Sequence, residues 1–182
     1  EAYKKELTSD ERFKNIEFKL EEGLINPFDK MIVRVKKEII RLDKKVNLRN
    51  IGKHISPKEF LDLSSNKEVV IIDARNDYES KAGKFKGAIL SNISTFREFP
   101  EFVNNLSIPK NTPIITYCTG GIRCEKASAY MAQQGFTNVS QLNGGIIKFC
   151  QELPNTLWEG ECFVFDNRLT SNINQKTKNI NS

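Results

Sequence analysis

The chain has 182 residues, of which 38% are hydrophobic and 28% are charged. This is enough for one ordinary α/β core and a small additional unit, but it excludes two large domains. No apolar run approaches the roughly 20 residues that a membrane-spanning helix needs, and no signal-peptide pattern is visible. The chain begins with Glu1, and its methionines are Met31 and Met131, so we expect a fragment of a longer protein.

Cysteine usage bears on compartment and metal binding. None of the four cysteines forms a CxxC pair or another zinc-ligand spacing, and the lone histidine, His54, has no second ligand near it in the sequence. We therefore expect a cytoplasmic protein with no metal site and no disulfide framework. The cysteines are Cys118, Cys124, Cys150 and Cys162.

The positive charge is concentrated in one segment. The formal net charge is +5, and residues 34–53 carry eight basic and two acidic residues, so the remainder of the chain is nearly neutral. A basic stretch of this kind attracts phosphate, although a solvated face of a strand and linker explains it equally well. The candidate RNA-binding residues in this stretch are Lys44, Lys45, Arg49 and Lys53.

Residues 1–42 predict a small separate unit with two strands. Apolar and charged residues alternate in two runs, as in strands with one buried face, and Gly23 and Asn26-Pro27 predict the turn between them. Two strands are not stable alone in water, so the unit needs a preceding segment or the second domain. The apolar positions of the runs are Ile16, Phe18, Leu20, Met31, Val33 and Val35.

Residues 43–55 are polar and basic and predict a linker. The motif Ser56-Pro57-Lys58-Glu59 then opens a helix, because it combines an N-cap serine, a proline at the first helical position and a glutamate at the third. A second motif of this kind, Thr95-Phe96-Arg97-Glu98, opens another helix.

Two short apolar runs, residues 69–72 and 113–117, predict parallel strands buried on both faces. The second run ends at Cys118, and a helix follows over residues 124–134, which Gly135 terminates. Because strands and helices alternate, we predict an α/β fold with an open parallel sheet and helices on both faces.

The predicted domain limits follow from these signals. The α/β domain spans residues 56–153, and residues 154–182 form a C-terminal extension. From residue 167 onward the extension has isolated apolar residues and no periodicity, so this tail is predicted to be disordered or cut short.

The strongest chemical signal is the loop Cys118-Thr119-Gly120-Gly121-Ile122-Arg123, between a strand and a helix. Its two glycines let consecutive backbone N–H groups turn inward as an anion-binding nest, and the helix N-terminus and Arg123 add positive charge. Such surroundings lower a cysteine pKa, so Cys118 is the expected nucleophile. A merely buried cysteine at a strand end is the alternative, but it gives no reason for the glycines and the arginine. Neither a Walker loop nor a GxGxxG fingerprint occurs.

Residues 56–150 resemble a rhodanese domain. The first signature is Ile72-Asp73-Ala74-Arg75-Asn76-Asp77-Tyr78-Glu79, and the second runs from Tyr117-Cys118 through Arg123 to Gly144-Gly145-Ile146. The resemblance implies that Cys118 accepts a sulfane sulfur as a persulfide or otherwise acts as a nucleophile. Lys84 and Phe149 stand where many members have histidine and tryptophan, positions at which no chemistry is expected.

Neighbouring residues have more limited predicted roles. Four residues separate Cys118 from Arg123, whereas the related protein phosphatases need five, so phosphatase activity is not expected. Asp73 and Arg75 lie where a strand ends, and we favour a structural ion pair over direct catalysis. Cys124 either resolves a persulfide or sulfenate on Cys118 or replaces a serine common in rhodaneses; the sequence leaves both open. Cys150 and Cys162 are predicted to pack in the core.

Three longer segments resemble the bacterial oxygen-dependent tRNA uridine hydroxylases. They are Cys118-Thr119-Gly120-Gly121-Ile122-Arg123-Cys124-Glu125-Lys126-Ala127, Thr95-Phe96-Arg97-Glu98 and Trp158-Glu159-Gly160-Glu161-Cys162-Phe163-Val164-Phe165-Asp166. The resemblance implies hydroxylation of carbon 5 of a wobble uridine in tRNA, with molecular oxygen as co-substrate. The sequence shows no flavin, haem or iron motif, so we expect no cofactor. The resemblance also implies that residues 1–42 are the second half of a truncated ferredoxin-like domain. The family's further cysteines are absent here.

Two functions from different classes follow. One is a tRNA-modifying oxygenase in which the Cys118 thiolate adds to carbon 6 of uracil, or in which an oxidised Cys118 transfers oxygen. The other is a sulfurtransferase that works through a Cys118 persulfide. A pure binding module is less favoured, because non-catalytic rhodanese domains commonly lack the cysteine.

Overall fold

The computed structural model describes residues 2–16, 18, 30, 32–165 and 169–171. The chain divides into two compact units, Glu1–Ile32 and Val33–Ser182. The described part of the first unit contains helix α1 (Ala2–Ser9) and a 3₁₀ turn, η1 (Glu11–Phe13), whose N-cap carboxylate, Asp10, accepts the Arg12 backbone N–H. Among the described residues, no helix has the length and apolar character needed to cross a bilayer.

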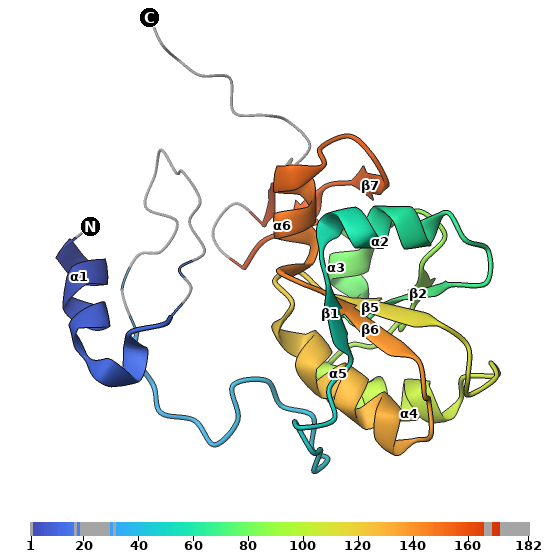
Figure 1. Cartoon of the computed structure of the whole chain (residues 1–182), viewed down its shortest axis with the longest axis horizontal. Coiled ribbons are helices and arrows are strands. Elements are labelled where there is room, and N and C mark those ends of the chain that lie inside the picture. Colours follow the sequence, from blue (N-terminus) through green and yellow to red (C-terminus); the bar gives the residue numbers. More distant parts are fainter. Residues whose placement is uncertain (1, 17, 19–29, 31, 166–168, 172–182) are drawn as a thin grey trace, which may run out of the picture. The chain divides into compact units, whose positions relative to one another are not determined.

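The second unit is built on a five-stranded sheet with the strand order β1-β6-β5-β2-β4 (Figure 1). All four pairings are parallel, so the carboxyl ends of the strands meet at one edge. The central strand β5 is buried along its whole length, as expected of a parallel strand covered by helices on both faces. The strands are β1 (Lys53–Ile55), β2 (Val70–Asp73), β4 (Ile89–Leu90), β5 (Ile114–Tyr117) and β6 (Val139–Leu142).

Helices cover both faces of this sheet (Figure 1). On one face α4 and α5 pack over a core that includes Phe99, Val103 and Met131; on the other, α2 and α6 pack over Phe60 and Phe149. The predicted α/β fold, an open parallel sheet with helices on both faces, is thereby confirmed. The helical elements are α2 (Pro57–Ser64), α3 (Asp77–Ala82), η2 (Phe96–Glu98), α4 (Phe99–Asn104), α5 (Ile122–Gln133) and α6 (Gly145–Glu152).

Two small antiparallel pairs complete the described fold. Strand β3 (Gly83–Phe85) pairs with β7 (Trp158–Gly160), and β8 (Cys162–Phe163) pairs with β9 (Thr170–Ser171). Residues 170–171 lie in the tail predicted to be disordered or cut short, and they form the strand β9. They are held by backbone pairing to β8, which a lack of side-chain periodicity does not reveal. Residues 172–182 lie outside the described residues.

The strand predictions for residues 1–42 are only partly testable. The positions of Leu20, the turn at Gly23 and Asn26-Pro27, and Met31 lie outside the described residues. For Val33 and Val35 the strand prediction is wrong: both side chains are exposed, and no strand is formed there. Alternation of apolar and charged residues makes a strand only where another strand pairs with the backbone.

Two predicted boundaries also differ from the structure. The last three residues of the predicted linker 43–55 form the edge strand β1, in which only Ile55 is buried, so the run is too short to show alternation. The helix expected to open at Thr95 begins with the 3₁₀ turn η2, and the Thr95 hydroxyl donates to the Glu98 carboxylate instead of accepting a backbone N–H. The capping box at Ser56 and Glu59 is formed as predicted.

Candidate active site

The loop 118–123 lies at the carboxyl edge of the sheet, between β5 and α5. Gly121 is the N-cap of α5 and has a φ of 89°, a left-handed conformation that favours glycine. This turn brings the Gly121 N–H to 3.1 Å from the Cys118 Sγ, so the backbone donates to the sulfur. The loop therefore solvates a thiolate with its own amides at a helix N-terminus.

The surroundings of Cys118 favour its ionised form. The thiol of Cys124 donates to the Cys118 sulfur; complete burial opposes ionisation, but the positive charge of Arg123 and the backbone N–H groups of Arg123 and Cys124 favour it. The net effect lowers the pKa of Cys118 to about 6. Near neutral pH the sulfur is therefore largely a thiolate, the nucleophilic form.

Cys124 lies in the first turn of α5 and is completely buried. Burial, and its hydrogen bond to the Cys118 sulfur, raise the pKa of Cys124 well above the ordinary thiol value. Cys124 thus stays protonated and acts as a donor to its neighbour. The sequence offered two roles for Cys124, a resolving thiol and a replacement for serine. A donor to Cys118 is a third role, and it is compatible with both.

Arg123 is held by a carboxylate for which the sequence predicted no role. Its guanidinium binds both oxygens of Glu79, with 2.7 Å between Nη2 and Oε1, and the Thr119 hydroxyl donates to the same carboxylate at 3.0 Å. Arg123 and Glu79 are 8% and 0% exposed. The cation therefore braces the loop and contributes its field to Cys118, and it does not present a free guanidinium to a substrate.

Asp73 and Arg75 form the completely buried ion pair expected from the sequence, with 2.6 Å between Oδ2 and Nη2. Arg75 also donates to the backbone carbonyls of Glu79 and Gly83, in α3 and at the start of β3, while Asp73 accepts from Ser80 and Tyr117. The pair therefore fixes α3, the helix that carries Glu79 to Arg123.

A second turn packs against the reactive loop. The backbone N–H groups of Ile146 and Ile147 donate to the carbonyls of Cys118 and Thr119, at 3.0 and 3.2 Å. Gly145 has a φ of 64°, and a Cβ atom at this position would collide with the same two carbonyl oxygens. The close approach of the two turns therefore requires glycine.

Comparison with known proteins decides the family. The model of the rhodanese-like domain matches residues 56–152, which is more than half of the chain. The chain belongs to the rhodanese-like domain family. The solution structure of a rhodanese-like domain from Anabaena sp. agrees in fold, with a TM-score of 0.51 and 19% identity over 60% of this chain and 80% of that one.

Curated relatives extend the similarity beyond the rhodanese-like domain. A protein from Bacillus cereus strain Q1, named tRNA uridine(34) hydroxylase, is 44% identical over 97% of this chain, and one of the same name from Bacillus thuringiensis strain Al Hakam is 43% identical over the same share. The chain covers 57% of the length of each of these relatives.

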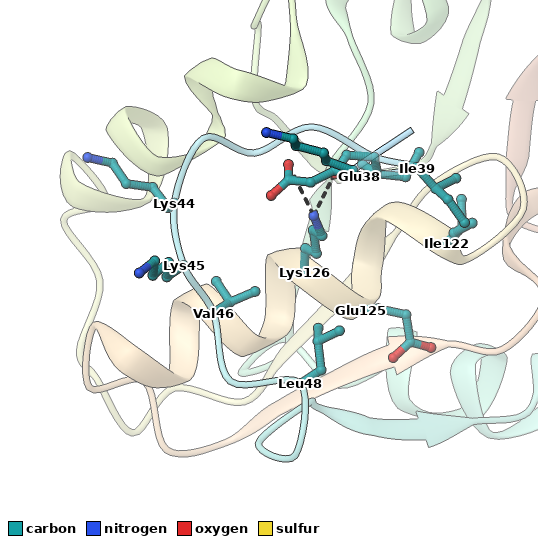
Figure 2. A pocket seen from close by; sticks show the side chains of 11 residues that line it. Glu38, Ile39, Lys44, Lys45, Val46, Leu48, Ile122, Glu125 and Lys126 are labelled. Atoms are coloured by element: carbon teal, nitrogen blue, oxygen red, sulfur yellow. Dashed lines mark hydrogen bonds and ion pairs between the residues drawn. The ribbon is translucent and has the colours of Figure 1, made fainter. Parts of the chain in front are cut away.

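The basic segment, residues 34–53, packs beside the loop 118–123. Lys44 and Lys45 line an open cavity of about 680 Å³ together with Ile122 of the loop. Figure 2 shows Lys126 reaching from α5 to Glu38, at 3.4 Å, which ties the segment to the helix. Within the described residues, no acidic side chain pairs with Lys44, Lys45 or Arg49, whereas Lys53 lies 3.6 Å from Glu59.

Other candidate residues lie away from the reactive sulfur. Cys150 and Cys162 are buried in the core on the side of the sheet that α2 and α6 cover. Burial raises the pKa of Cys150 to about 12. His54 contacts the Glu125 carboxylate at 2.8 Å. In the described part of the chain, no three histidine, cysteine or acidic side chains gather as a metal site requires.

The residue that sequence reasoning missed is Glu79. It stands in the first rhodanese signature, four residues after Arg75, but a glutamate in the first turn of a helix ordinarily caps it or faces water. The Glu79 carboxylate does accept the N-cap N–H of Asn76, at 3.2 Å, in addition to binding Arg123. Only the tertiary contact between α3 and α5 reveals that second role.

Proposed function

We propose that the protein hydroxylates carbon 5 of the wobble uridine in tRNA, with Cys118 as the nucleophile. The observation that carries the proposal is the similarity to proteins named tRNA uridine(34) hydroxylase, which extends over 97% of the chain. The preformed thiolate site supports it, because uracil is an electrophile at carbon 6 and requires a sulfur that is ionised near neutral pH.

The proposed reaction begins with addition of the Cys118 thiolate to carbon 6, which forms an S–C bond and moves an electron pair into an enolate. Carbon 5 then binds molecular oxygen and a proton as a hydroperoxide. Two equivalents of a thiol reductant convert it to the alcohol and water and become a disulfide. Loss of the carbon 5 proton expels Cys118 and restores the ring. Molecular oxygen is the co-substrate, and no cofactor takes part.

The loop contributes to this chemistry through its electrostatics. The α5 N-terminus and the inward N–H groups stabilise negative charge on the sulfur before addition and after its expulsion. Glu79 keeps Arg123 in place, so the positive charge stays beside the sulfur throughout the cycle. Because the Cys118 sulfur is buried, the uracil ring has to leave its base stack in the tRNA to reach it.

The proposed reaction is tested with isotopically labelled oxygen. The full-length protein incubated with tRNA, a thiol and labelled O₂ should incorporate the label into 5-hydroxyuridine, as measured by nucleoside mass spectrometry, and should form none under anaerobic conditions. Cys118→Ser should abolish the product and leave tRNA binding largely intact, because a serine hydroxyl stays protonated in the same loop. Product formed without oxygen contradicts the proposal.

A sulfurtransferase is the second candidate, and the match of residues 56–152 to the rhodanese-like domain favours it. The same loop amides would stabilise a Cys118 persulfide. Cys118→Ser removes both activities and cannot separate them. Robust turnover of thiosulfate by the wild-type protein, with no tRNA product, would select the sulfurtransferase.

We expect the basic segment to bind the phosphate backbone of tRNA. Reversing Lys44, Lys45 and Arg49 to glutamate should weaken binding and flatten its salt dependence by up to about 0.7 to 0.9 log units for each phosphate that the variant no longer neutralises. Filter binding or fluorescence anisotropy across a salt series measures both quantities. A matched control with the same change in net charge reverses three exposed lysines elsewhere in the domain, Lys58, Lys67 and Lys86. If both triple variants bind alike, the segment is only a solvated surface.

A further inference from the structure

Three aromatic side chains outside the core form a connected cluster. The rings of Tyr78 and Phe163 lie 5.0 Å apart between centroids, those of Phe163 and Phe165 lie 5.2 Å apart, and both pairs meet edge to face. Tyr78 is 41% exposed and Phe165 is 59% exposed. We call these three residues the aromatic platform.

The aromatic platform adjoins the reactive loop. The Arg123 guanidinium carbon lies 5.9 Å from the centroid of the Phe165 ring. Tyr78, which directly precedes Glu79 in α3, reaches Phe165 through Phe163. The aromatic platform therefore contacts the ion pair that supports the Cys118 loop through Phe165.

Packing alone does not account for these rings. Phe60, Phe85, Phe99 and Phe149, which pack between the sheet and its helices, are completely buried. Single exposed apolar residues are common, but a contiguous exposed aromatic cluster next to a reactive loop is typical of a surface that binds a ligand.

We propose that the aromatic platform stacks a nucleobase of the tRNA anticodon loop that adjoins the reacting uridine. This inference rests on the proposed function and adds a substrate-binding surface to it. Extraction of the uridine toward Cys118 breaks its stacking on the neighbouring base, and an exposed ring next to the loop can replace that missing partner. Stacking tolerates any base, because every base presents a flat π face.

The occupant follows from position and charge. Phe165 lies against Arg123, whose charge acts on Cys118, so the part of the substrate nearest to Phe165 is the nucleotide beside the uridine in the same strand. Lys44 and Lys45 line a cavity that Ile122 of the same loop also lines, so basic side chains are available to phosphates farther along that strand.

The test compares three substitutions of Phe165 in the full-length protein. Phe165→Ala should raise KM for tRNA by about five- to 150-fold, the range expected for loss of one stacked base, and should weaken binding of an anticodon stem-loop RNA by a similar factor. Phe165→Trp should retain wild-type values. Phe165→Leu, which keeps apolar bulk but has no π face, should behave like Phe165→Ala. Leu63→Ala, at an exposed position near the end of α2, is the control and should change neither quantity.

Further measurements separate stacking from a structural role. The pH midpoint of Cys118 alkylation should be the same in all Phe165 variants, and a shifted midpoint would show that the ring only supports the loop. Wild-type KM for Phe165→Leu would show that apolar bulk alone is sufficient and would overturn the proposal. Photo-crosslinking of a stem-loop RNA with 5-iodouridine beside the target uridine should label the aromatic platform. Because binding and crosslinking need no turnover, they report on the platform even if no 5-hydroxyuridine is formed.

Discussion

At pH 7, iodoacetamide should modify Cys118 about a hundredfold faster than Cys150. Both side chains are at most 1% exposed, so access does not separate them, but their pKa values of about 6 and about 12 do. The thiolate fractions at pH 7 differ by roughly five orders of magnitude. The thiolate of the more acidic thiol is also less nucleophilic. With a Brønsted slope of about 0.4 to 0.5, this lowers the rate advantage of Cys118 by roughly two and a half to three orders of magnitude.

The pH profile gives a second measure of the same site. The alkylation rate of Cys118 should be half-maximal near pH 6 and level above pH 7, because the thiolate is then the dominant form. Timed alkylation, acid quenching and peptide mass spectrometry give the rate for each cysteine. Equal rates for the four cysteines in the folded protein, or a Cys118 midpoint at the ordinary thiol value, would refute an activated sulfur.

Substitution of Cys124 identifies the donor within this site. Cys124→Ala removes the side-chain hydrogen bond that contributes most to the lowered pKa of Cys118, so the alkylation midpoint should move to higher pH. Cys124→Ser retains a donor of similar size and should keep most of the shift. A wild-type midpoint in Cys124→Ala would mean that the thiol of Cys124 has no such role.

Asp73→Ala should destabilise the protein by about 3 to 5 kcal/mol, because it leaves the buried guanidinium of Arg75 without its counter-charge. The variant also removes the acceptor for Ser80 and Tyr117. Urea denaturation should show a lower midpoint with an unchanged slope.

Two further variants show whether the loss of stability comes from the unpaired buried charge. Asp77→Ala breaks an exposed pair with Lys81 on the same helix and should leave the free energy of unfolding close to the wild-type value. Asp73→Ala combined with Arg75→Met removes both charges and should recover part of the stability. If Asp73→Ala alone is as stable as the wild type, the pair does not fix α3.

The sheet and its helices were predictable because their signals are local. The short runs at residues 69–72 and 113–117 predict β2 and β5 to within one residue, and the Ser56 capping box predicts where α2 begins. Predictions failed where a tertiary partner decides the outcome: β1 and β9 are two or three residues long and exist because another strand pairs with them.

The same distinction applies to the site. The Cys118 loop is contiguous, so its amides and its helix N-terminus could be inferred from residue order. The contact between Glu79 and Arg123 joins residues 44 positions apart, and the aromatic platform joins α3 to the β8 segment. No role could be assigned to Phe163 and Phe165 from the sequence, because a ring is apolar whether it lies in a core or on a surface.

The turn at Gly145 has a consequence for how this loop can diversify. The backbone N–H groups of Ile146 and Ile147 donate to the carbonyls of Cys118 and Thr119. The two turns lie so close that a Cβ atom at Gly145 does not fit. A longer loop, such as the one expected in the related protein phosphatases, would have to displace this downstream turn as well. The loop and the turn can therefore change only together, and a segment of α6 that does not reach the reacting atoms limits the length of the loop that carries the cysteine.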